Sequence, residues 1–91
     1  MTCENKFTVR IESEGGLHAR PAGMIAKTAS QFKSTIMISA HGENKNAKSI
    51  MNIMAMGLKK DEEVCFTASG DDAVPALSAI SELFNKHFQI Q

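Results

Sequence analysis

A histidine and an arginine stand just before a proline in the segment Gly16-Leu17-His18-Ala19-Arg20-Pro21-Ala22. Imidazole is a neutral nucleophile near pH 7, and its phosphorylated nitrogen is a good leaving group. Arginine adds a forked cation that suits a phosphate. The pair His18 and Arg20 therefore predicts a site that holds a phosphoryl group and passes it on.

This segment is also expected to open a helix. Proline is tolerated in a first turn, because its missing N–H has no intrahelical partner there. Small and apolar residues then follow at helical spacing: Ala22, Ile25, Ala26, Ala29 and Phe32. The helix should run from about Arg20 to Gln31, so His18 lies just outside an N-terminus whose N–H groups and dipole favour anions.

A second, shorter helix is predicted after Ser49. The run Ile50-Met51-Asn52-Ile53-Met54-Ala55-Met56 contains good helix formers and ends at Gly57. Serine at an N-cap and glycine after the last turn are the usual limits of a helix. The phosphoryl site and Ser49 are thus expected on two helix N-termini that lie next to each other.

The other elements follow from alternation and turn residues. Strands are predicted over residues 7–11, 35–40, about 45–47 and 64–69, with a turn at His41-Gly42-Glu43-Asn44. Asp71 or Asp72 should cap a last helix with apolar residues at helical spacing: Val74, Leu77, Ile80, Phe84 and Phe88. The order β-α-β-β-α-β-α indicates an α+β fold, an open-faced sandwich. Three helices would cover one face of a four-stranded, mostly antiparallel sheet.

Composition restricts the class of protein. The 91 residues are expected to form a single domain, 1–91, and the formal net charge of zero argues against direct nucleic-acid binding. No run approaches the roughly 20 apolar residues that span a bilayer, and the first six residues lack the apolar run of a signal peptide. Cys3 and Cys65 are too few for a disulfide framework, and Cys65 is expected to be a buried, inert thiol. We therefore expect a cytoplasmic protein.

The sequence contains none of the common motifs for metal or nucleotide binding. The sequence has no H-x-x-x-H, no CxxC, no clustered carboxylates and no Gly-rich loop leading into a Lys-Ser/Thr helix. No cofactor is expected. His41 and His87 are interpreted as solvated surface residues.

Two motifs carry a resemblance to a known family. Gly16-Leu17-His18-Ala19-Arg20-Pro21-Ala22 resembles the active-site signature of HPr, the histidine-containing phosphocarriers of the bacterial phosphotransferase system. Lys48-Ser49-Ile50-Met51-Asn52-Ile53-Met54-Ala55-Met56-Gly57-Leu58 is similar to the regulatory-serine region of that family, as found in low-GC Gram-positive bacteria. The resemblance extends from Phe7 to Phe88.

The resemblance implies that His18 takes a phosphoryl group from enzyme I and passes it to sugar-specific IIA domains. Arg20 would lie beside that group, and Nδ1 would be the reacting nitrogen. Ser49 would be the target of an HPr kinase/phosphorylase, and the serine-phosphorylated form a corepressor of the catabolite control transcription factor. Such a protein is a carrier with a covalent phospho-histidine, not a stand-alone catalyst, and is expected to be a monomer.

The apolar cluster on the second helix is ambiguous by itself, because most such clusters are core. On so short a helix, however, not every member can face inward, and methionine suits adaptable protein contacts. With the resemblance, we expect Met51 to be exposed and partner-facing, Ile50 and Met54 to be partly so, and Ile53 to face the core.

One position departs from the family, and some alternatives stay open. Gly15 stands where some members have Asn or Ser, so a side-chain hydrogen bond to the histidine or its phosphoryl group is unavailable from that position. The family's catabolite-repression paralogue lacks the histidine, so His18 argues against a pure regulator. A carrier of the nitrogen-related branch is disfavoured by the Gram-positive-like serine region, and an unrelated α+β domain by the two motifs together.

Overall fold

The computed structural model describes residues 5–12, 14–86 and 88. Its elements follow the predicted order: β1 (Asn5–Arg10), α1 (Ala19–Ala29), β2 (Thr35–Ala40), β3 (Glu43–Asn46), α2 (Ile50–Ala55), β4 (Glu63–Ser69) and α3 (Ala73–Asn85). The third strand begins earlier than expected. His41 and Gly42 both have positive φ and alone form the turn, as in the tight hairpins that match strand twist, so Ala40 pairs directly with Glu43.

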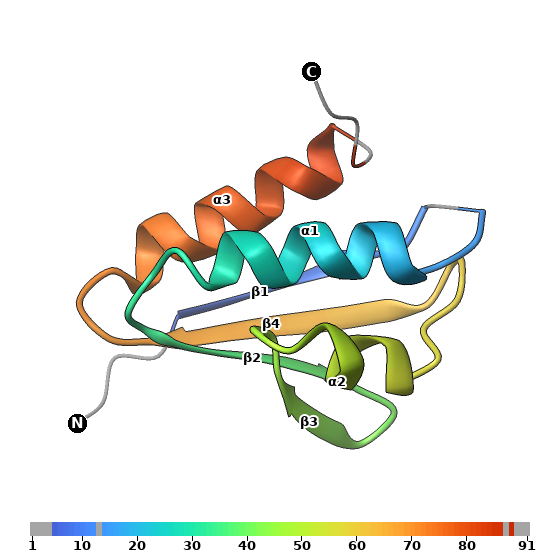
Figure 1. The fold of residues 1–91 in the computed structure, drawn as a ribbon, viewed down its shortest axis with the longest axis horizontal. Coiled ribbons are helices and arrows are strands. Elements are labelled where there is room, and N and C mark those ends of the chain that lie inside the picture. The colour runs from blue at the N-terminus through green and yellow to red at the C-terminus, as the bar shows by residue number, and fades with distance from the viewer. Residues whose placement is uncertain (1–4, 13, 87, 89–91) are drawn as a thin grey trace.

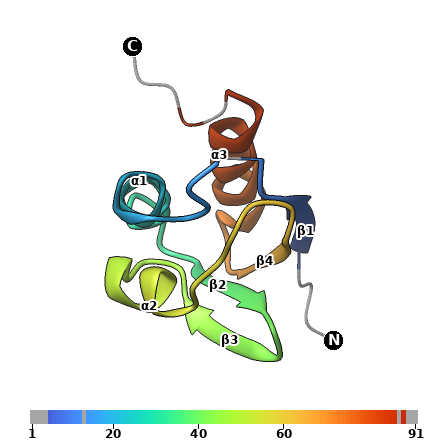
Figure 2. The ribbon, with the colours of Figure 1, turned by 90° about the vertical axis from the view of Figure 1, so that its right-hand side faces the viewer.

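The four strands form one sheet in the order β1-β4-β2-β3, and each neighbouring pair is antiparallel. All three helices lie on one side of this sheet (Figures 1 and 2), which confirms the open-faced arrangement. In Figure 2 the other side of the sheet carries no helix. The fold therefore has one buried layer between the sheet and its helices.

Alternation along β4 determines which side chains enter that layer. Val64, Phe66 and Ala68 are buried, whereas Cys65, Thr67 and Ser69 on the opposite face are only half-buried. The Phe66 ring stacks on Phe7 at 5.3 Å between centroids. Cys65 was expected to be buried, and that prediction is wrong, because its place in the alternation turns it to the face that the helices leave open.

The first helix buries the residues that its periodicity predicts, except at its end. Ala22, Ile25, Ala26 and Ala29 are buried, whereas Phe32 lies beyond the helix and is half-buried. The ammonium of Lys48 donates to the Phe32 carbonyl at 2.8 Å. This contact ties the segment after α1 to the segment just before α2.

Asp72 occupies the N-cap position of α3, but its carboxylate does not cap that helix. It instead accepts hydrogen bonds from the Lys33 and Ser34 amides, each at 2.9 Å, and from the Ser34 hydroxyl. Of the two predicted candidates, Asp72 stands at the N-cap position, but the prediction that its side chain caps the helix is wrong, because that side chain binds a different segment. It fastens the α1–β2 connection to the start of α3.

The Ser34 hydroxyl and then the Lys33 amide hold the pKa of Asp72 below its ordinary value. A lowered folded pKa means that the stabilisation is present above about pH 4 and is lost as pH falls through the lowered value. The Asp72→Asn variant should therefore melt a few degrees lower at neutral pH and lose less of its stability on acidification. Thermal unfolding between about pH 7 and pH 2 measures this, with the exposed neighbour Asp71→Asn as control. If the melting temperatures of the wild type and Asp72→Asn fell in parallel with pH, the Asp72 carboxylate would not be the source of this stabilisation.

Candidate functional site

The segment that carries His18 is held against the connection between α2 and β4. The Leu17 amide donates to the Leu58 carbonyl at 3.1 Å, and the Leu17 side chain is buried. Gly16 has a φ of +68°, and a Cβ there would lie 2.1 Å from the Leu58 oxygen. The close approach and the positive φ both require glycine at this position.

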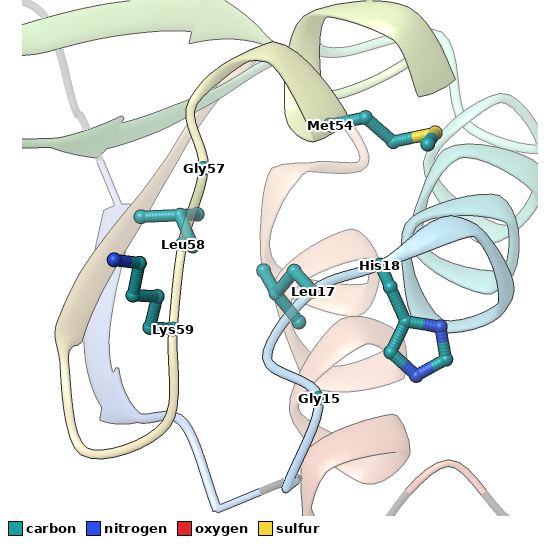
Figure 3. A pocket seen from close by; sticks show the side chains of 7 residues that line it. All are labelled: Gly15, Leu17, His18, Met54, Gly57, Leu58 and Lys59. Carbon is teal, nitrogen blue, oxygen red and sulfur yellow. The ribbon is translucent and has the colours of Figure 1, made fainter.

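His18 is the N-cap residue of α1. Its backbone is extended, with φ −78° and ψ −166°, and its carbonyl accepts the Ala22 amide at 2.9 Å. The imidazole makes no capping hydrogen bond and is exposed. Figure 3 shows the His18 ring projecting from the start of α1. The N–H groups of a first helical turn have no intrahelical partner and suit an anion.

One edge of the imidazole lies against the backbone of Gly15. A Cβ at position 15 would be 2.7 Å from His18 Cδ2 and 3.2 Å from Nε2. Because Cδ2 and Nε2 share the covered edge, Nδ1 lies on the edge that faces away from Gly15. The glycine therefore permits a ring orientation that a larger residue would alter.

The Gly15→Ala variant should turn the His18 ring while leaving the fold intact. A Cβ cannot stay 2.7 Å from His18 Cδ2, so either the ring or the backbone must move, and the exposed ring moves more easily than the backbone. The free energy of unfolding should change by less than about 1 kcal/mol, whereas the ring's NMR chemical shifts and the rate of phosphoryl acceptance should both change. Gly23→Ala is the matched control, because a Cβ there meets nothing within 4 Å. An unchanged ring signal in Gly15→Ala would show that the contact does not orient His18.

Arg20 lies in the first turn of α1 and is exposed. It forms no ion pair with any residue that the structure describes. A guanidinium without a carboxylate partner is available to an incoming phosphate.

A hollow of about 260 Å³ joins this site to α2. Its lining consists of Gly15, Leu17, His18, Met54, Gly57, Leu58 and Lys59 (Figure 3). The Lys59 side chain points away from His18 in that view, and Arg20, the other predicted site residue, is not part of the lining. Leu58 and its neighbours were not among the expected site residues, because only tertiary pairing brings them to Leu17.

The exposures on α2 agree with expectation. Met51 is 80% exposed, Ile50 and Met54 are each 44% exposed, and Ile53 is fully buried. The three exposed side chains make up an apolar patch on α2, and Met54 reaches the hollow beside His18. Contiguous exposed apolar side chains are more typical of contact surfaces than single ones are.

Ser49 is the N-cap of α2, as predicted. Its Oγ accepts the Asn52 amide at 3.2 Å, and the residue is half-buried. The expectation that the two helix N-termini are neighbours is wrong, because α1 and α2 run past each other in opposite senses (Figure 1). Met54 and Gly57 at the end of α2 lie beside His18, whereas Lys48, just before Ser49, contacts Phe32 beyond the end of α1.

None of the helices in the described part of the chain has the length and apolar character needed to cross a membrane. Within the same residues, no group of three or more His, Cys, Asp or Glu side chains is placed to hold a metal ion. His41 is exposed, as expected, and contacts Glu62. Cys3 and His87 lie outside the described residues.

Known proteins resemble the chain in both sequence and fold. The family described as "PTS HPr component phosphorylation site" matches residues 5–86. The phosphocarrier protein HPr of Mycoplasma capricolum is 48% identical over 85% of the chain and 86% of its own length. The phosphocarrier protein HPr of Treponema pallidum is 45% identical over 90% of the chain and 93% of its own length.

Among solved structures, HPr-C-His from Thermoanaerobacter tengcongensis superposes with a TM-score of 0.90 at 38% identity. The match covers 96% of the chain and 98% of that protein. Sequence and fold thus agree over almost the whole length. The chain belongs to the HPr family, the phosphocarriers of the phosphotransferase system.

Proposed function

We propose that His18 is the residue that carries the phosphoryl group, taking it from enzyme I and giving it to the IIA domains of sugar permeases. The observation that supports this best is the free imidazole at the open N-terminus of α1. The lone pair of Nδ1 attacks phosphorus, the new N–P bond forms, and the bond between phosphorus and its donor breaks. Onward transfer reverses these roles.

Nδ1 is proposed as the reacting atom because Gly15 covers the opposite edge of the ring. The first-turn amides of α1 and the unpaired Arg20 would receive the charge of the phosphoryl group. Both are exposed and compete with water, so they stabilise the group without holding it against transfer. The patch Ile50, Met51 and Met54 is proposed as the docking surface that partners share.

We further propose that Ser49 is a regulatory site, phosphorylated by an HPr kinase/phosphorylase. Phosphate adds nearly two negative charges, and a helix N-terminus tolerates them. The fold should therefore persist while docking changes, because the new charge adjoins Ile50 and Met51. An acidic partner would be repelled, and the phosphorylated form would bind the catabolite control transcription factor as its corepressor.

The remaining proposals concern context. We propose that the 91 residues act as one domain, as a monomer in the cytoplasm. In that setting the protein needs no cofactor, because the phosphoryl group arrives already activated on enzyme I.

Mass spectrometry of the phosphorylated protein tests both sites. Incubation with phosphoenolpyruvate and enzyme I should place an acid-labile phosphate on His18, whereas ATP with HPr kinase should place an acid-stable phosphate on Ser49. Phosphate on another residue in the first reaction would refute the carrier site, and no phosphate in the second would refute the regulatory site. Restoration of sugar uptake in a carrier-deficient strain separates a carrier from a pure regulator.

A further inference from the structure

The connection between α2 and β4 is closed by the side chain of Glu62. Its Oε1 accepts the Lys59 amide at 2.8 Å, and its own amide donates back to the Lys59 carbonyl at 3.2 Å. Its Oε2 lies 2.8 Å from Nε2 of His41, in the β2–β3 turn. The Lys59 amide and then His41 hold the pKa of the Glu62 carboxyl below its usual range. One carboxylate thus joins the turn at 59–62 to the hairpin.

The hairpin turn and the turn at 59–62, which this contact joins, each contain a residue with an unfavourable backbone conformation. His41 has a φ of +55° and Asp61 one of +75°, which cost non-glycine residues energy. Asp61 is held there by its amide, which donates to the Ile11 carbonyl at 2.7 Å. Such conformations persist where surrounding contacts over-determine them, and they cluster at functional sites. Asparagine or glycine would suit the turn position of His41 better, so its side-chain contact is the feature to explain.

The link leads to the segment that carries His18. The turn closed by Glu62 begins at Lys59, and the preceding carbonyl, that of Leu58, binds the Leu17 amide. The Lys60 ammonium lies 3.2 Å from the Glu14 carboxylate and adds a second contact between the same two segments. A shift of the turn would therefore displace the backbone on which His18 stands.

We propose that Glu62 and His41 are positioning residues for phosphoryl transfer, acting through the Lys59 turn and the Leu58–Leu17 hydrogen bond to hold the His18 imidazole in place. This rests on the proposed role of His18. Neither residue touches the reacting atoms. Both lie outside the apolar patch, so they govern how fast docked partners exchange phosphate and not how tightly they dock.

The Glu62→Ala variant tests the positioning role of Glu62. The kcat for phosphoryl acceptance from phosphorylated enzyme I should fall about tenfold with little change in KM, and hydrogen exchange at the Leu17 amide should accelerate. Glu62→Gln keeps an oxygen for the Lys59 amide and should recover most of the rate. Glu63→Ala is the matched control, because it removes the neighbouring carboxylate, whose partner Arg10 lies 3.9 Å away at the sheet. It should leave kcat and Leu17 exchange unchanged.

The His41→Gly variant separates positioning from stability. Glycine adopts positive φ without strain, so the melting temperature should hold or rise while kcat falls. An unchanged kcat in both Glu62→Ala and His41→Gly, or an equal loss in Glu63→Ala, would overturn the proposal. That result differs from failure of the carrier assignment, which would appear as full labelling of a protein lacking His18.

Discussion

The His18→Ala variant should accept no phosphate from phosphoenolpyruvate and enzyme I, even after long incubation. The substitution removes the nucleophile, and among the described residues that line the hollow the other side-chain nitrogen, Nζ of Lys59, points away from His18 (Figure 3). The fold should survive, since the side chain is exposed and makes no capping bond. Radiolabel from phosphoenolpyruvate, followed by gel electrophoresis under alkaline conditions, measures the effect.

His41→Ala provides the control for that experiment. It removes another exposed imidazole, and although acceptance should be slower, the final extent of labelling should equal that of the wild type. Circular dichroism of both variants shows whether they are folded. Undiminished label on a folded His18→Ala protein would refute the assignment of the acceptor.

The Gly16→Ala variant should be the most destabilising single-methyl change in the site. The left-handed conformation costs a residue with a Cβ about 1–2 kcal/mol, and overpacking against a backbone carbonyl adds about 1–3 kcal/mol. The contact cannot relax cheaply, because the Cβ would meet the Leu58 oxygen at 2.1 Å and the Lys59 Cα at 2.9 Å. For a chain of this size we expect the melting temperature to fall by roughly 10–25 °C.

The Gly42→Ala variant serves as the control, because the difference in stability between it and Gly16→Ala gives the part of the loss that is due to contact. Gly42 has a φ of +76°, close to that of Gly16, but a Cβ there meets nothing within 4 Å. It should cost only the conformational term, about 1–2 kcal/mol. Equal destabilisation of the two variants in calorimetry would mean that the approach of Gly16 to Leu58 has no energetic weight.

Local patterns predicted the order of the elements, because alternation and helical spacing reflect which face is buried, but helical spacing also selected Val74 of α3, which is 62% exposed. The cap at Ser49 was predicted from the preference for serine at a helix N-cap. The exposure of Met51 and the burial of Ile53 were predicted from the shortness of the helix together with the family resemblance. The same reasoning failed for Cys65, whose residue type favours burial. Its position in β4 nevertheless places it on the open face of the sheet.

Relations between distant segments were less predictable. An aspartate before a helix reads as a cap, yet Asp72 binds the Ser34 amide and hydroxyl, a contact that no local pattern reveals. The opposed directions of α1 and α2 likewise follow from packing. Glu62 illustrates the general reason, since its two partners belong to a turn and a hairpin that only the folded sheet brings together.

The open cap of α1 has a consequence for the energetics of the whole relay. In the proposed role of His18, a phosphoryl group on its ring would give the first-turn amides an acceptor that they lack at rest, and that gain would make loading more favourable and unloading less favourable by the same amount. The strength of one helix end therefore tunes the group-transfer potential of the carrier. Because His18, Ala19 and Arg20 are exposed, water competes for this helix end, and we expect the two steps to stay near balance, so that phosphate flows in either direction as the loading of donors and acceptors changes.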